Sequence, residues 1–82
     1  MKIKYFAWIK NITNTDSEEI SNKNIVDIES LKIYLCKKYP KLENHILKDQ
    51  IIRISVNLEY TSDNIILTNK DEIAFFPPVS GG

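Results

Sequence analysis

Apolar and polar residues alternate in three stretches of the chain, and this period of two predicts β-strands. The stretches are Lys2–Lys10, Gln50–Leu58 and Glu72–Phe76. The first has an apolar side and a side that mixes lysines with aromatics: Ile3, Tyr5, Ala7 and Ile9 against Lys2, Lys4, Phe6, Trp8 and Lys10. By the same parity, Ile73 and Phe75 belong to the core, and Phe76 lies opposite them.

The segments between these strands carry weaker signals. Asn11–Asp16 is rich in turn residues, and Ser17–Ser21 can form a short strand that points Ile20 inward and completes a hairpin. Tyr60–Leu67 is less regular and predicts a short strand or a bend, and Asn69–Asp71 predicts a turn. Two or three strands are therefore expected after the middle of the chain.

A single amphipathic helix is predicted at Ile28–Tyr39. Asp27 can accept a backbone N–H as the N-cap, and Pro40 ends the helix because the residue before proline avoids the helical region. Between them, one face of the helix carries an apolar stripe of Ile28, Leu31, Leu35 and Tyr39. Lys41–Asp49 can add a further helical turn.

This order of elements predicts an α+β fold of the β-grasp, or ubiquitin-like, type. One apolar helix stripe and one apolar sheet face are buried most economically when the helix lies across a mixed sheet of four or five strands. We expect the first and last strands to pair in parallel at the centre. Residues 1–76 would form the domain, and residues 77–82 an extended tail.

Composition narrows the functional classes. Eighty-two residues make one small domain, and 11 basic against 11 acidic residues give a net charge of zero, so the protein lacks the overall basic field typical of nucleic-acid binders. No apolar run approaches the roughly 20 residues of a membrane helix, and the start of the chain lacks a signal-peptide pattern. The single cysteine, Cys36, cannot form an intramolecular disulfide. We expect a cytoplasmic protein.

Two residues with possible chemistry have simpler structural explanations. Cys36 lies beside the apolar stripe of the predicted helix and is expected to be buried, as free cysteines usually are. His45, the only histidine, has no cysteine or second histidine at metal-ligand spacing and is expected at the surface near a helix end. No metal site is predicted.

The distribution of glycine is the most unusual feature of the composition. Average usage would give about six glycines, whereas this chain has two, Gly81 and Gly82, at its end. Pro77 and Pro78 give the tail a stiff base, and a tip without side chains can enter a narrow channel. The reactive group on offer is the α-carboxylate of Gly82, which needs activation, for example as an acyl-adenylate. The alternative is that Gly-Gly is a frayed end or a cloning remnant.

The segment Asp71-Glu72-Ile73-Ala74-Phe75-Phe76-Pro77-Pro78-Val79-Ser80-Gly81-Gly82 closely resembles the molybdopterin synthase small-subunit family of sulfur carriers. The likeness extends more loosely to Tyr5-Phe6-Ala7, Asp27-Ile28-Glu29-Ser30-Leu31 and Val56-Asn57. One departure is Lys70, where the family usually has glycine before the acidic pair. A left-handed residue in this turn would then have to be Asn69, or the turn is of another type.

The resemblance implies a β-grasp fold and a defined chemistry. An E1-like adenylyltransferase would use ATP to adenylate Gly82, and sulfur transfer would give a thiocarboxylate. The tail, including Gly81, would enter the large subunit of a heterotetramer, which builds the dithiolene of molybdopterin from precursor Z. The chain itself would bind no cofactor and supply no catalytic side chains. The predicted partner contacts are Phe6, Trp8, Phe76, Pro77, Pro78, Val79 and Ser80.

Three other functions remain open from the sequence. A sulfur carrier for thiamine thiazole synthesis would also end in Gly-Gly, although the lead-in Phe-Phe-Pro-Pro-Val-Ser fits the molybdopterin family better. A ubiquitin-like modifier would be joined to lysines of other proteins through Gly82. A plain binding module would carry an inert tail.

Overall fold

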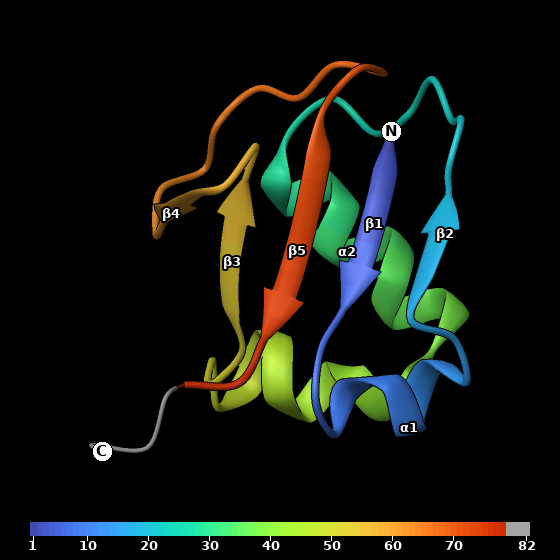
Figure 1. Cartoon of the computed structure of the whole chain (residues 1–82), viewed down its shortest axis with the longest axis vertical. Helices are drawn as coiled ribbons and strands as arrows, with labels where there is room; N and C mark the ends of the chain where they lie inside the picture. Colours follow the sequence, from blue (N-terminus) through green and yellow to red (C-terminus); the bar gives the residue numbers. More distant parts are fainter. Residues whose placement is uncertain (79–82) are drawn as a thin grey trace.

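The structure is a computed structural model that describes residues 1–78. These residues form one mixed sheet in the order β2-β1-β5-β3-β4, with the helix α2 across one face (Figure 1). The strands are β1 (Lys2–Tyr5), β2 (Ser17–Glu19), β3 (Arg53–Val56), β4 (Glu59–Thr61) and β5 (Glu72–Phe76). The helices are α1 (Ile9–Thr13), α2 (Ile28–Lys38), a 3₁₀-helix η1 (Pro40–Leu42) and a π-helix η2 (Asn44–Lys48).

The predicted β-grasp arrangement is confirmed. β1 and β5 pair in parallel with Ile3 opposite Ile73 and Tyr5 opposite Phe75, while β2 and β3 run antiparallel beside them. The helix-facing side of the sheet and the apolar stripe of α2 form the core, which includes Ile3, Tyr5, Ile20, Ile28, Leu31, Leu35, Ile54, Val56, Ile73 and Phe75. Strand parity therefore identified the core side of β5 correctly.

The first strand is shorter than its alternation predicts. β1 ends at Tyr5, and the chain turns through Ala7 at φ 54° into α1, which buries Ile9 completely. The prediction of a strand to Lys10 was wrong because alternation cannot show where the pairing partners end. β5 stops one residue past the partner of Tyr5, so an extended β1 would have no neighbour there. Asn11 is accordingly in a helix and not in a turn.

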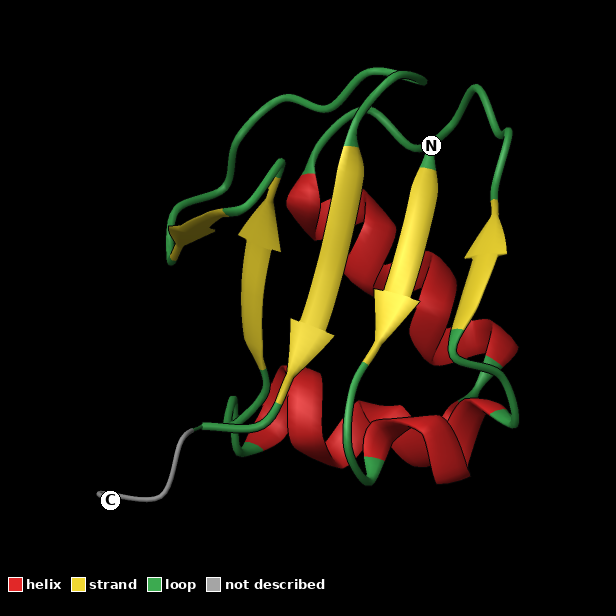
Figure 2. Cartoon of the chain, viewed as in Figure 1, coloured by secondary structure: helices red, strands yellow, loops and turns green. Residues whose placement is uncertain are grey.

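The segment after the core helix is more helical than a single extra turn. α2 ends one residue earlier than predicted, with Tyr39 as its C-cap, and Pro40 begins η1. η1 leads into η2, so the expected helical turn in Lys41–Asp49 is confirmed, and its Leu42 and Ile46 are buried. Figure 2 shows α1 and these short helices at one end of the sheet, beneath the carboxyl end of β5.

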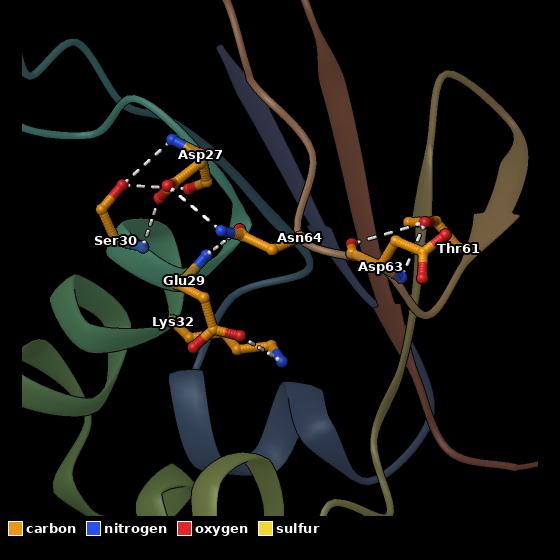
Figure 3. A network of polar contacts seen from close by, with 7 residues as sticks. All are labelled: Asp27, Glu29, Ser30, Lys32, Thr61, Asp63 and Asn64. Carbon is orange, nitrogen blue, oxygen red and sulfur yellow. Dashed lines mark hydrogen bonds and ion pairs between the residues drawn. The ribbon is translucent and has the colours of Figure 1, made fainter.

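The start of α2 is capped from two sides (Figure 3). Asp27 accepts the backbone N–H of Ser30 at 2.8 Å, and the Ser30 hydroxyl accepts the Asp27 N–H at 3.1 Å, which forms a capping box. Asn64 lies in the loop after β4 and accepts the N–H of Glu29 at 2.9 Å. The predicted N-cap is confirmed, and Asn64 adds a second cap that joins the loop after β4 to the helix.

The middle strands are shorter than predicted, and a tight hairpin connects them. β3 covers Arg53–Val56 of the expected Gln50–Leu58, and β4 pairs with it through a two-residue turn at Asn57 and Leu58. Both turn residues are left-handed, at φ 52° and 71°. Asparagine tolerates this region, whereas it costs other non-glycine residues about 1–2 kcal/mol.

A carboxylate network that the sequence did not reveal fastens β1 and β2 to α2. One oxygen of Glu18 accepts the hydroxyls of Tyr5 at 2.7 Å and Tyr39 at 2.6 Å, and its other oxygen pairs with Lys38. Burial disfavours the charged form of Glu18, but the hydrogen bonds from Lys38, Tyr39 and Tyr5 outweigh it and lower its pKa. The network holds the last residue of β1 at the edge of the core.

The residues of Met1–Pro78 include no helix that is both long and apolar enough to cross a bilayer.

Candidate functional site

The carboxyl end of β5 is the root of the predicted tail. Phe75 accepts the backbone N–H of Phe6 at 3.0 Å, and Phe76 pairs with Arg53 across the sheet. Pro77 is half-buried and Pro78 exposed. Because β5 has a neighbouring strand on each side, its end is fixed in position, and the chain leaves the sheet from a rigid base.

The predicted partner-contact aromatics gather at this end, although the strand argument for two of them was wrong. Phe6 and Trp8 follow β1 instead of lying in it, and they are 46% and 36% exposed. Phe76 is half-buried and lies opposite Ile73 and Phe75 in parity, as predicted. Their role in binding a partner stays a prediction.

Trp8 also contacts the π-helix. Its ring meets that of His45 edge-to-face with 4.9 Å between centroids, and the Nδ1 atom of His45 is buried without a hydrogen-bond partner. The backbone carbonyl of His45 in turn accepts the N–H of Ile51 at 3.0 Å. His45 lies near a helix end as predicted, in the first turn of η2, but the expectation of a surface side chain was wrong because His45 is half-buried.

The acidic turn before β5 fixes the other end of this strand. Asp71 accepts the side-chain amide of Asn57 at 2.9 Å and the N–H of Thr68 at 2.7 Å, and Asn57 accepts the N–H of Glu72 at 2.9 Å. These hydrogen bonds, that of Asn57 first, lower the pKa of Asp71. The prediction of Asp71 as a turn residue is confirmed.

The turn itself resolves the alternative raised by Lys70. Asp71 donates its N–H to the Thr68 carbonyl at 3.1 Å, which closes a four-residue turn. Neither Asn69 nor Lys70 has a positive φ, so the turn is of a type that needs no left-handed residue. This explains how Lys70 can stand where the resembling family has glycine.

Charged groups on the outer face of the sheet are partly paired. Lys4 lies 3.5 Å from Glu72, and both side chains are about one third exposed. Lys2 is exposed, whereas Lys10 belongs to α1 and not to the strand face on which it was predicted. Cys36 is buried as predicted, and burial raises the pKa of its thiol, which fits a structural residue.

The residues with the predicted reactive role lie outside the described part of the chain. These are Val79, Ser80, Gly81 and Gly82. Within residues 1–78, no group of three or more His, Cys, Asp and Glu side chains could hold a metal ion. The described part of the site is therefore the fixed carboxyl end of β5, with the aromatic side chains of Phe6, Trp8 and Phe76 around it.

The fold defines a class of protein: a β-grasp domain whose last strand, β5, lies inside the sheet between β1 and β3. The chain belongs to the ThiS family, whose model matches residues 3–82. It is 31% identical to the molybdopterin synthase sulfur carrier subunit of Mycobacterium tuberculosis, over 100% of this chain and 96% of that one. With the protein of that name from Escherichia coli it shares 30% identity, covering 100% and 99%.

Solved structures give the same fold and two kinds of name. A putative molybdopterin converting factor, subunit 1, from Pyrococcus furiosus superposes with a TM-score of 0.80 at 29% identity, covering 95% of each chain. Small archaeal modifier protein 1 from Methanosarcina acetivorans gives 0.79 at 27% identity, covering 99% of this chain and 94% of that one. The predicted family and fold are confirmed.

Proposed function

We propose that this chain is the sulfur-carrier subunit of a molybdopterin synthase and that its sulfur is carried on the carboxyl group of Gly82. The observation that supports the proposal most strongly is the family match through residue 82, together with full-length relatives that are named as sulfur carrier subunits. The central, doubly paired β5 supports it further, because it presents the tail from a fixed base.

The proposed chemistry begins with activation of a poor electrophile. The Gly82 carboxylate attacks the α-phosphorus of ATP on an E1-like adenylyltransferase, and pyrophosphate leaves. A sulfide-equivalent nucleophile then attacks the acyl carbon, AMP leaves, and a thiocarboxylate remains. Glycine suits this step because the acyl carbon carries no bulky neighbour.

The second stage takes place on the large subunit. The thiocarboxylate sulfur is transferred to the pterin precursor, and water restores the carboxylate of Gly82. Each loaded chain delivers one sulfur, so a dithiolene consumes two loaded chains. Phe6, Trp8, Phe76 and the tail from Pro77 onward are the proposed contacts with the large subunit.

Intact mass spectrometry tests the first stage. The chain is incubated with ATP, its cognate E1-like enzyme and a sulfur donor, and its mass is measured. Replacement of one oxygen by sulfur supports both the molybdopterin and the thiamine carrier. An unchanged mass with active partners excludes both. Addition of the large subunit and the pterin precursor then separates the two pathways, because the thiamine carrier would yield no molybdopterin.

A second candidate function is a ubiquitin-like modifier. It is favoured by the similarity to a structure named small archaeal modifier protein 1. In this case an amine of a target lysine, and not sulfide, attacks the activated Gly82. The same incubation with added acceptor proteins would then give conjugates of higher mass.

A further inference from the structure

The segment between η2 and β3 lies beside the root of the tail. Arg53 is the first residue of β3 and the cross-strand partner of Phe76, the last residue of β5. The Nη1 atom of Arg53 donates to the Gln50 carbonyl at 3.5 Å, and the residue after Gln50, Ile51, is 37% exposed. This segment flanks the tail root from the β3 side, as Phe6 flanks it from the β1 side.

The same segment is joined to Trp8 through η2. The backbone N–H of Ile51 donates to the carbonyl of His45 at 3.0 Å, and the ring of His45 meets that of Trp8 with 4.9 Å between centroids. α1 and η2 lie together at this end of the sheet (Figure 2). Direct contacts therefore connect the new segment to Trp8, one of the predicted partner contacts.

Arg53 brings a positive charge to the tail root that the described chain does not neutralise. None of the ion pairs within residues 1–78 involves Arg53, whereas Lys4 on the same side of the sheet is paired with Glu72. Two further charges in this segment, Lys48 and Asp49, are exposed and opposite in sign. An exposed guanidinium binds a carboxylate through two parallel hydrogen bonds. Arg53 is therefore available to a carboxylate from outside residues 1–78.

The length of the tail limits where that carboxylate can lie. Six residues follow Phe76, and a chain of six spans at most about 20 Å when fully extended. A pocket that acts on the carboxyl group of Gly82 must lie within that distance of β5, so the protein around its entrance meets the tail root. Arg53 lies at the base of the tail, whereas the pterin reacts at the tip. The group that Arg53 meets is therefore part of the protein at the entrance.

We propose that Arg53 and Ile51 form a second contact with the large subunit, in which Arg53 binds a carboxylate at the entrance of the tail pocket. Ile51 packs against an apolar side chain beside that carboxylate. The inference rests on the proposed function, which makes the large subunit the lasting partner of this chain. A paired charge at the base of the tail fixes the orientation in which the domain meets the pocket.

The test measures binding of the full-length chain to its cognate large subunit by calorimetry. Arg53→Gln is expected to weaken binding about tenfold, because a hydrogen bond between charged groups is lost, and to reduce its salt dependence. Arg53→Lys should give an intermediate affinity, since lysine keeps the charge without the paired hydrogen bonds. Ile51→Ser should weaken binding about threefold.

Two matched controls carry the same changes elsewhere. Lys23→Gln removes a positive charge from an exposed position in the loop before α2, and Ile33→Ser changes an isoleucine that is 49% exposed on α2. Both should bind within about twofold of wild type, as surface substitutions away from a contact usually do. A loss with Lys23→Gln equal to that with Arg53→Gln would show a general effect of charge and overturn the assignment of Arg53.

The remaining outcomes separate this inference from the proposed function. Binding of Arg53→Gln at wild-type affinity would overturn the second contact, as would a loss confined to the adenylyltransferase. In either case the wild-type chain would still bind the large subunit, and the proposed function would stand. Failure of the wild-type chain itself to bind the large subunit would overturn the proposed function and this inference together.

Discussion

β1 and β5 lie side by side and point the same way, yet the chain leaves them differently. After Tyr5 the chain turns back through Ala7 into α1 and buries Ile9 beneath the sheet. After Phe76 it continues into Pro77 and the exposed Pro78. The exit of β1 completes the core, and the exit of β5 leads away from it. Substitutions in the segment after β1 should therefore affect mainly stability, and substitutions in the segment after β5 mainly function, although both segments lie at the same end of the sheet.

The largest expected effect is on the exit of β5. Deletion of Gly82 should abolish sulfur loading, because the shortened chain ends on a different carboxyl group. The fold should not change, since Gly82 follows the last strand by six residues. Intact mass after the loading reaction and a thermal melt measure the two effects. Loading of the shortened chain to the wild-type level would show that Gly82 is not the reactive residue.

The matching experiment changes a buried residue in the segment that follows β1. Ile9→Ala should cost about 2–5 kcal/mol of unfolding free energy, because it leaves a cavity in a fully buried position. Pro77→Ala at the exit of β5 should leave stability within about 0.5 kcal/mol and lower the rate of sulfur transfer. Urea unfolding of both variants checks this. Equal destabilisation by the two changes would remove the distinction between the exits.

A third change tests the network that holds the end of β1. Glu18→Gln should destabilise the fold by about 2–3 kcal/mol near neutral pH, because it weakens charged hydrogen bonds from Tyr5, Tyr39 and Lys38. Since the folded pKa of Glu18 lies below its ordinary value of 4.5, this stability is present above about pH 4.5 and is lost as the pH falls further. Unfolding curves of variant and wild type should therefore converge in acid. A difference that is constant with pH would argue against an ionised Glu18.

The smallest effect compares the chain's two alanines. Ala7→Gly should stabilise the fold by about 0.5–1 kcal/mol, since Ala7 has a positive φ that glycine adopts without strain. Ala74→Gly should destabilise it by a similar amount, because Ala74 lies within β5. Because both variants replace alanine with glycine, the comparison separates the effect of the backbone conformation at each position from the effect of the substitution itself. Melting temperatures that shift in the same direction would contradict the assignment of Ala7 to the turn.

The sequence predicted the fold well where the hydrophobic pattern shows which side chains are buried. It predicted poorly the features that depend on where a neighbouring strand begins or ends. The parity of Ile73 and Phe75 and the stripe of α2 both report a buried side, so the β-grasp arrangement followed from them. The length of β1 depends on where β5 ends, and alternation carries no information on this.

The site was predictable in part for the same reason. The terminal motif is local, so the chemistry proposed for Gly82 could be read from it. The contacts of Glu18 join residues about 13 and 21 positions apart, and the strain at Leu58 depends on a φ angle, so neither has a sequence signal.

The central claim is that the chain carries sulfur to a pterin, and transfer of a labelled atom tests it most directly. The chain is loaded with radioactive sulfur, purified, and mixed with the large subunit and the pterin precursor in a single turnover. The account predicts that the label leaves the chain and appears in molybdopterin, with two loaded chains consumed for each product. Label that stays on the chain, or that is released as sulfide while the chain becomes joined to lysines of other proteins, would contradict it.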